Sequence, residues 1–242
     1  MSQKLWEATS QTKKKSNLFE FEKFLSNKFN YKAKKNYKKL FDWTIRNPKL
    51  FWSSIWEYAN IKGIKNDKFF FPKEIIKSKF LVKSKLNYAE NLLSKNDNSK
   101  AVTFISENGY RVEKSWKELN NDTLKIINFF RENKIIEKDR VAAYTINQIE
   151  TVESFLAASA IGAIWSSCSP DFGTQGVIER FSQINPKLLI ITDRYYYNGK
   201  EINIIKRLPA ILKKIKSIKS VLVINYPGKK NLKQKKLKGI KI

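Results

Sequence analysis

The sequence contains no histidine, and Cys168 is its only cysteine. Without an imidazole, the chain cannot build a Ser-His-Asp or Cys-His nucleophile, nor a zinc site with histidine ligands. One cysteine cannot form an intramolecular disulfide, which fits a reducing compartment. Any chemistry that the chain serves must therefore rest on carboxylates, lysines, backbone groups or bound co-substrates.

Long hydrophobic runs are missing as well. No apolar stretch approaches the roughly 20 residues that a membrane-spanning helix needs. The N-terminal residues MSQKLWEATSQTKKK lack the apolar core of a secretory signal. We therefore expect a cytoplasmic protein with no membrane span, and we expect residues 1–16 to form a loosely held polar arm.

Negative charge is scarce, because 48 Lys and Arg face only 22 Asp and Glu, for a formal net charge of +26. A surface of this sign would suit a nucleic-acid-binding module. Only seven of the basic residues are arginines, however, and the lysines are spread along the whole chain. Phosphate and base recognition favours arginine forks. Compositional drift toward Lys, Asn, Ile, Phe and Tyr is therefore the favoured interpretation, and a basic nucleic-acid-binding module is the alternative.

Helical periodicity dominates the first part of the chain. Apolar residues recur at helical spacing in 18–29 and again in 37–46. Asn47 followed by Pro48 predicts the start of a third helix, in which Trp52 and Trp56 are expected to belong to the core. The polar run KNDNSK suggests a boundary, so we predict a helical N-terminal unit over residues 1–95.

Strands and helices alternate in the second part, residues 96–242. An Asn-Gly turn at 108–109 predicts a hairpin, and Ser115 with Glu118 has the spacing of a capping box, as does Asn147 with Glu150. Short apolar strands then alternate with helices. The strands are expected at 140–146, 163–169, 187–193 and 220–225. This order predicts an α/β fold with a mostly parallel sheet and helices on both faces.

In such sheets, ligands bind beyond the carboxyl ends of the strands. The loops expected at that edge are 147–148, 169–174 and 193–200. Cys168 lies in an apolar strand without a neighbouring base, so a buried thiol is favoured over a nucleophile. Asp171 and Asp193 are interpreted as turn-forming or capping carboxylates. The sequence predicts no catalytic residue and no metal ligand.

Several stretches of the chain together resemble a known family. They are LWE, NPKLFWSSIWEYA, LNYAENLL, SWKEL, the uninterrupted block from Asp139 to Lys187, and YYYNGK. This pattern is similar to the acetate-type acyl-CoA synthetases of the adenylate-forming (AMP-binding) superfamily, and most closely to the acetoacetyl-CoA synthetases (acetoacetate–CoA ligases). The discriminating part is WSSCSPDFG, because acetyl- and propionyl-CoA synthetases carry a glycine- and phenylalanine-rich turn there.

The resemblance implies an AMP-forming ligase of ketone-body and lipid metabolism. ATP and acetoacetate would give an acyl-adenylate and pyrophosphate, and coenzyme A would then displace AMP. ATP and coenzyme A are the implied co-substrates, with Mg²⁺ in the full-length enzyme. The resemblance covers an N-terminal part of such a synthetase, and the TSGTTG-like phosphate loop has no counterpart here. The chain alone is therefore expected to form no acyl-adenylate and to bind no cofactor tightly. Another short-chain acyl-CoA synthetase is the alternative within the family.

The resemblance also implies where coenzyme A would lie. Related synthetases use an arginine- and glycine-rich stretch to meet its phosphates, and the corresponding residues here are Tyr197, Asn198, Gly199 and Lys200. Tyr197 stands where an arginine is usual, and its ring could stack on adenine. The turn Ser169, Pro170, Asp171 and Phe172 is implied to line the same ligand, with a purely structural turn as the alternative.

Overall fold

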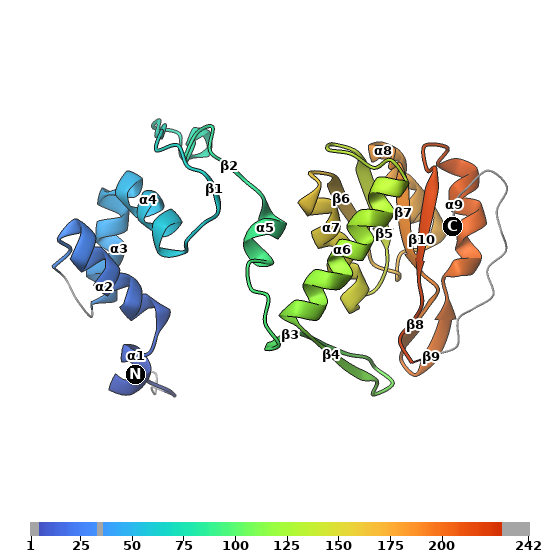
Figure 1. Ribbon diagram of the computed structural model, residues 1–242, viewed down its shortest axis with the longest axis horizontal. Coiled ribbons are helices and arrows are strands. Elements are labelled where there is room, and N and C mark those ends of the chain that lie inside the picture. The colour runs from blue at the N-terminus through green and yellow to red at the C-terminus, as the bar shows by residue number, and fades with distance from the viewer. Residues whose placement is uncertain (1–4, 33–35, 229–242) are drawn as a thin grey trace. The chain divides into compact units, whose positions relative to one another are not determined.

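The computed structural model describes residues 5–32 and 36–228. Their contacts divide the chain into two compact units, Met1–Leu86 and Asn87–Ile242 (Figure 1). The sequence placed the boundary between residues 95 and 96. The contacts place it earlier, because α5 (Tyr88–Leu92) packs on α7 (Ile149–Ala160) of the second unit and Asn87 Nδ2 donates to Ser159 O at 2.8 Å.

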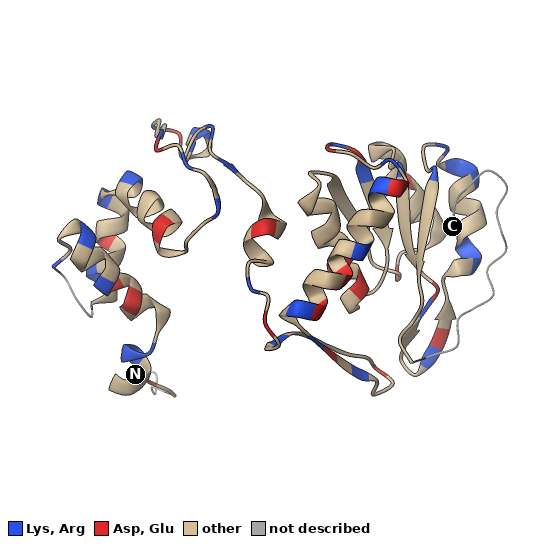
Figure 2. Cartoon of the chain, viewed as in Figure 1, with Lys and Arg blue, Asp and Glu red and all other residues tan. Residues whose placement is uncertain are grey.

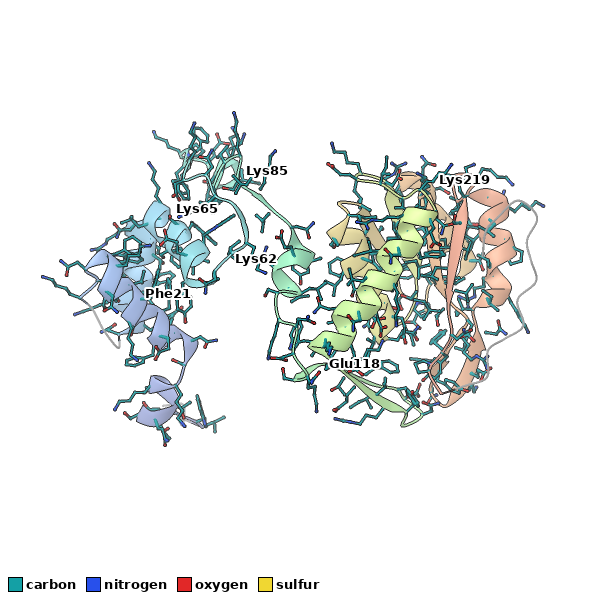
Figure 3. The ribbon with its side chains drawn as sticks, in the orientation of Figure 1. Phe21, Lys62, Lys65, Lys85, Glu118 and Lys219 are labelled. Carbon is teal, nitrogen blue, oxygen red and sulfur yellow. The ribbon has the colours of Figure 1, made fainter. Side chains whose placement is uncertain are left out.

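The first unit is mainly helical. It contains α1 (Ser10–Lys14), α2 (Asn17–Phe29), α3 (Tyr37–Arg46) and α4 (Pro48–Tyr58). The last three confirm the helices predicted from apolar periodicity. Helix α1 shows that the predicted loose arm contains a short helix, which the Thr9 side chain caps at its N-terminus. Phe21, labelled in Figure 3, packs edge-on against Tyr58 with ring centroids 5.1 Å apart. Trp56 is buried as expected, but Trp52 is 39% exposed.

An extended loop completes the first unit. The strands β1 (Gly63–Ile64) and β2 (Lys85–Leu86) pair antiparallel at its base, and a 3-10 turn, η1 (Ile75–Lys77), lies between them in the sequence.

The second unit begins with a hairpin and a long helix. The strands β3 (Lys100–Ile105) and β4 (Arg111–Ser115) pair antiparallel across the predicted Asn-Gly turn. Helix α6 (Trp116–Glu132) begins with the predicted capping box, because Ser115 Oγ accepts from the Glu118 amide and the Glu118 carboxylate accepts from the Ser115 amide. This box fixes the point at which the strand ends and the helix begins.

A parallel sheet forms the centre of the second unit, as predicted. Its strands are β5 (Arg140–Tyr144), β6 (Ile164–Cys168), β7 (Leu188–Thr192) and β10 (Ser220–Ile224), in the spatial order β10-β7-β5-β6. The connecting helices are α7 (Ile149–Ala160), α8 (Thr174–Ile184) and α9 (Leu208–Lys214). A short 3-10 helix, η2 (Ile205–Arg207), directly precedes α9.

The two faces of the sheet bury alternate residues, as the period of a strand requires. On β5, Val141 and Ala143 pack with α6 and α7, whereas Ala142 and Tyr144 pack with α8 and α9. Helices therefore cover both faces (Figure 1), which explains why the strands are continuous apolar runs.

One capping prediction was wrong. Gln148, not Asn147, is the N-cap of α7, and no side chain caps that helix end. The spacing of Asn147 and Glu150 gave a false capping box because α7 begins at Ile149, one residue later than a cap at Asn147 would require. The lysine-rich C-terminal residues 229–242 lie outside the described residues.

Candidate functional site

A cleft of about 380 Å³ opens at the carboxyl ends of the central strands. Its lining comes from three regions, namely the end of β5 with the start of α7, the end of β6 with the turn that follows it, and the segment after β7. The lining residues are Thr145, Ile146, Asn147, Thr151, Ser167, Cys168, Ser169, Pro170, Asp171, Tyr195, Tyr196 and Tyr197. The chain adds β6 on one side of β5 and then crosses to add β7 on the other side. The cleft therefore lies at the topological switch point of the sheet, where open α/β folds bind ligands.

The loop after β5 forms the first wall. Thr151 Oγ1 donates to Ile146 O at 2.8 Å and lies 3.1 Å from Thr145 Oγ1, so the start of α7 is tied to the end of β5. Gln148, next to the lining residue Asn147, is fully buried, and both polar atoms of its side chain are without a hydrogen-bond partner among the described residues. Buried amides are normally paired, so this one leaves hydrogen-bonding capacity beside the cleft.

The SPDFG turn after β6 forms the second wall, and Arg207 holds it from behind. Arg207 Nη1 lies 2.9 Å from Phe172 O and 3.2 Å from Pro170 O, and it also donates to the Tyr144 hydroxyl. Tyr144, fully buried on β5, donates to Phe172 O at 2.5 Å. The Arg180 guanidinium lies 4.0 Å from the centre of the Phe172 ring. The turn is therefore fixed by the hydrogen bonds that its carbonyls accept and by a cation–π contact.

The polar groups that face the cleft include no acid–base pair suited to catalysis. Ser169 Oγ donates to Asp171 Oδ2 at 2.8 Å, which confirms Asp171 as a turn-forming carboxylate. Burial, together with a hydrogen bond to Asp171, raises the pKa of Tyr195. Burial raises the pKa of the Cys168 thiol, although Arg180 opposes the shift. A thiol and a phenol that stay neutral at physiological pH can line a ligand but cannot serve as a nucleophile or general base there.

The third wall is a hairpin that the sequence analysis treated as a loop. The strands β8 (Arg194–Tyr197) and β9 (Lys200–Asn203) pair antiparallel around Asn198 and Gly199. Both turn residues have positive φ, 51° and 72°, as a two-residue hairpin turn of type I′ requires. The glycine is therefore explained by the turn, and the Gly199 amide donates to Glu107 Oε1 at 3.0 Å.

The predicted site residues divide between the cleft and its rim. Ser169, Pro170, Asp171 and Tyr197 line the cleft. Lys200 pairs directly with Tyr197 across the hairpin, so the two side chains project from the same face. The remaining candidates, Phe172, Asn198 and Gly199, lie beside the cleft and are not part of its lining.

Several residues of the site were missed in the sequence. Thr145 directly follows β5 and Thr151 lies in the first turn of α7, on either side of the expected loop 147–148, and Tyr195 lies in β8. Arg207 has no local signal, because its acceptors on residues 170 and 172 are distant in sequence.

Removing the Arg207 side chain is expected to loosen the SPDFG turn. Arg207→Ala should lower the free energy of unfolding by about 2 kcal/mol, because its charge-assisted hydrogen bonds to the carbonyls of Pro170 and Phe172 are lost. It should also speed chymotrypsin cleavage after Phe172. Urea denaturation and timed proteolysis measure both effects, with the exposed Arg131→Ala as control. Equal proteolysis of both variants would show that Arg207 does not hold the turn.

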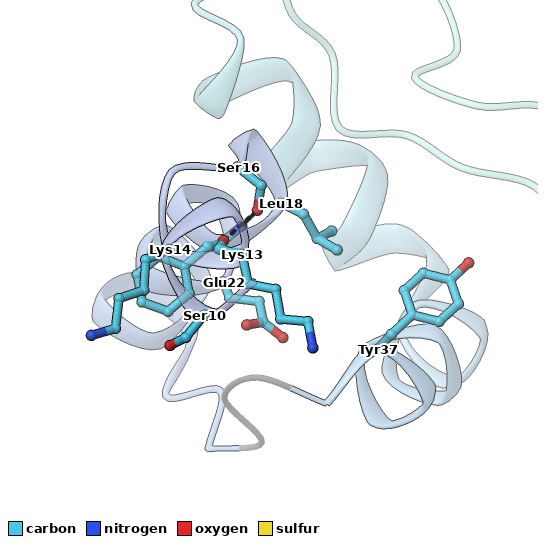
Figure 4. Close-up of a pocket in the computed structure, with 8 residues that line it drawn as sticks. Ser10, Lys13, Lys14, Ser16, Leu18, Glu22 and Tyr37 are labelled. Carbon is cyan, nitrogen blue, oxygen red and sulfur yellow. Dashed lines mark hydrogen bonds between the residues drawn. The ribbon is translucent and has the colours of Figure 1, made fainter. Parts of the chain in front are cut away.

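A second cavity, of about 280 Å³, lies in the first unit between α1, α2 and the start of α3 (Figure 4). Its polar groups are used for local structure. Ser16 Oγ caps α2 and donates to Lys13 O at 2.7 Å, and Lys13 Nζ lies 3.4 Å from Glu7. In the part of the chain that the structure describes, no three Asp, Glu, Cys or His side chains converge as metal ligands, so no residue is assigned to Mg²⁺.

Comparison with known proteins identifies relatives of this architecture. A protein-family model described as "AMP-binding enzyme" matches residues 91–240. The acetoacetyl-coenzyme A synthetase of Rhizobium meliloti (strain 1021) is 33% identical over 225 residues, which cover 93% of this chain and 34% of that protein. The acetoacetyl-CoA synthetase of Xenopus tropicalis is 38% identical over 200 residues, covering 79% of this chain and 29% of that protein.

The fold also matches a solved structure. The acetoacetyl-CoA synthetase from Streptomyces lividans superposes with a TM-score of 0.86 at 24% identity, over 99% of this chain and 37% of that one. At this identity the match supports the fold alone. The chain spans about a third of the length of these relatives, as the shares of 34% and 37% state.

Proposed function

This chain belongs to the AMP-binding enzyme family, and from that membership we propose that it serves as part of an acetoacetate–CoA ligase. The reaction would join acetoacetate and coenzyme A at the expense of ATP, giving acetoacetyl-CoA, AMP and pyrophosphate. Its relatives at 33% and 38% identity are named acetoacetyl-CoA synthetases, which supports this substrate assignment. We place the activity in the cytoplasm, in keeping with a single thiol that is buried and unpaired.

The observation that carries the proposal is the cleft at the switch point. Its loops follow β5, β6 and β7, and two of them are the segments that the resemblance assigned to coenzyme A. A ligand in the cleft would meet a fixed turn on one side and the tyrosines of β8 on the other. The absence of an acid–base pair among its described residues suits a binding wall rather than a reaction centre.

Individual residues have distinct roles in this proposal. The Tyr197 ring, 64% exposed, offers a face on which adenine can stack. Lys200, opposite it on β9, supplies a point charge for a phosphate. Gly199 shapes the hairpin, and its amide is already used by Glu107. None of these residues takes part in bond making, so the chain contributes affinity and orientation of the thiol donor.

Reversing the charge at position 200 tests this arrangement. Lys200→Glu should weaken coenzyme A binding by roughly fivefold or more, since a surface charge contact is lost and a repulsion is added. Equilibrium dialysis of the purified chain against coenzyme A measures the affinity, which we expect to be weak. Lys213→Glu, an equal charge change at an exposed position on α9, is the control. Equal effects of the two variants would contradict a phosphate contact at Lys200.

One relative favours a different acyl substrate as the alternative. The malonamoyl-CoA synthetase vrtB of Penicillium aethiopicum is 28% identical over 225 residues. The cleft described above would serve any acyl group equally well, because it contacts the thiol donor. Acyl specificity is therefore tested separately, by comparing acetoacetate with other short carboxylates in an assembled ligase.

A further inference from the structure

The loop of the first unit presents two aliphatic side chains to solvent. Ile75 and Ile76 form the first two residues of η1, and they are 86% and 91% exposed. Phe70, at 56%, and Phe80, at 45%, lie on the flanking segments. Exposed aliphatic side chains are common singly, but an adjacent pair at a loop tip beside exposed aromatics forms an apolar patch.

Backbone hydrogen bonds and aromatic contacts fix the segments that lead to the tip of the loop. The backbone of Phe70 and Lys79 pairs through hydrogen bonds of 2.9 and 2.8 Å, and Val82 N donates to Lys68 O at 2.7 Å. Phe80 contacts Phe71 with ring centroids 5.3 Å apart, and it contacts Trp52 of α4 at 5.1 Å. The helical part of the unit therefore holds the loop, and the isoleucines are displayed rather than folded inward.

Lysines surround this patch. Residues 65–85 contain two carboxylates, Asp67 and Glu74. The same range contains seven lysines, at positions 65, 68, 73, 77, 79, 83 and 85. Figure 2 shows the basic residues along the loop, and Figure 3 labels Lys65 and Lys85 near its two-stranded base. Lys65 is paired with Glu57 and Asp67, and Lys77 with Glu74. Lys73 and Lys79, which flank the tip, form no ion pair with another described residue.

We propose that this loop, residues 65–85, is a docking surface for an anionic lipid bilayer, into whose interface Ile75 and Ile76 insert. Aliphatic side chains gain from entering the acyl boundary, while long lysine side chains reach back to phosphate and carboxylate headgroups. Charge complementarity names the partner, because an apolar tip ringed by cations fits an acidic bilayer surface.

Two other occupants fit less well. Nucleic acid would gain nothing from isoleucines, because single strands bind through aromatic stacking and arginines. A second copy in a two-fold dimer would place the same patch against itself, and the lysines of both copies would repel. The described residues contain no helix long and apolar enough to cross a membrane, so the attachment would be peripheral.

Vesicle cosedimentation of the full 242-residue chain tests the proposal. The chain should bind vesicles of phosphatidylcholine with phosphatidylserine and release them as salt rises, and it should bind phosphatidylcholine alone much less. Ile75→Asn with Ile76→Asn should weaken binding by about tenfold or more, the scale expected for losing two inserted side chains. Ile136→Asn, an equally polar change at a 65% exposed site in the second unit, should leave binding unchanged.

Charge reversals distinguish binding through the loop from a general attraction between a basic chain and acidic vesicles. Lys73→Glu with Lys79→Glu should weaken binding by roughly fivefold per lysine, whereas Lys213→Glu with Lys214→Glu should have little effect. Equal losses in the loop and control variants would overturn the proposal, as would failure of the unaltered chain to bind acidic vesicles at low salt. Light scattering that shows a dimer abolished by the isoleucine changes, without vesicle binding, would also overturn it. The result is independent of the coenzyme A site.

Discussion

Replacing Lys114 with methionine is expected to lower the free energy of unfolding by about 3–5 kcal/mol, the cost of leaving a buried charge without its partner. Lys114 Nζ, at the end of β4, lies 2.6 Å from Glu153 Oε1 and 2.7 Å from Asp122 Oδ2. Glu153, on α7, is only 2% exposed. Its carboxylate would lose its cation while remaining inside the unit. Urea denaturation of the purified chain measures the change.

The pH dependence of this loss has a definite sign. Burial raises the pKa of Glu153, although Lys114 opposes the shift. Without Lys114 the folded-state pKa should rise further above the unfolded value. A carboxyl whose folded pKa is raised favours folding when it is protonated, so the destabilisation should shrink as the pH falls toward and below the pKa of an ordinary glutamate.

Matched variants keep this prediction specific. Lys114→Met with Glu153→Leu removes both charges and should recover most of the lost stability. Lys125→Met removes an exposed partner of the same Asp122, so it should have little effect. A Lys114→Met variant as stable as the unaltered chain at neutral pH would contradict the pairing.

Replacing Asp193 with alanine is expected to lower the free energy of unfolding by about 3 kcal/mol or more, because a buried network loses its acceptor. Asp193 is 1% exposed and follows β7 directly. Its carboxylate accepts from the Tyr226 amide at 2.7 Å and from Arg194 Nε at 3.0 Å. Its backbone carbonyl accepts from the amides of Ile204 and Ile205. Asp193 thus joins β7, β10 and the β8–β9 hairpin.

The Asp193 variant should also disturb the tyrosine wall of the cleft. Asp193→Asn keeps an acceptor for the Tyr226 amide but loses the charge beside Arg194, so it should fall between the alanine variant and the unaltered chain. Thermal and urea unfolding rank the three proteins. If the asparagine variant were as stable as the unaltered chain, the charge contact with Arg194 would not contribute. The sequence interpretation of Asp193 as a local cap underestimated this role, since its partners are distant in the chain.

The elements that sequence patterns predicted best are those with a local cause. The apolar runs of β5 and β7, the capping box at Ser115 and the Asn-Gly turn at 108–109 each depend on neighbouring residues, and each is present. The β8–β9 hairpin carries the same Asn-Gly signal, at Asn198 and Gly199. It was missed because the three tyrosines before it were assigned to a ligand-binding loop.

Parts of the site could not be predicted from local patterns. Arg207 reaches the SPDFG turn only because α9 and α8 cover the same face of the sheet. Glu153 meets Lys114 only because α7 packs on α6 and β4 ends beside them. The side of the sheet on which a helix lies is a property of topology, and a single sequence specifies it only through the whole fold.

The account depends most on the claim that the cleft at the switch point holds coenzyme A. Titration of the isotope-labelled chain with coenzyme A, followed by backbone amide chemical shifts, tests it directly. We predict saturable shifts confined to residues 145–151, 167–172 and 195–200, and a reduced response in the Tyr197→Ser variant. Shifts confined to other parts of the chain, or none at concentrations where coenzyme A would occupy a weak site, would contradict the assignment.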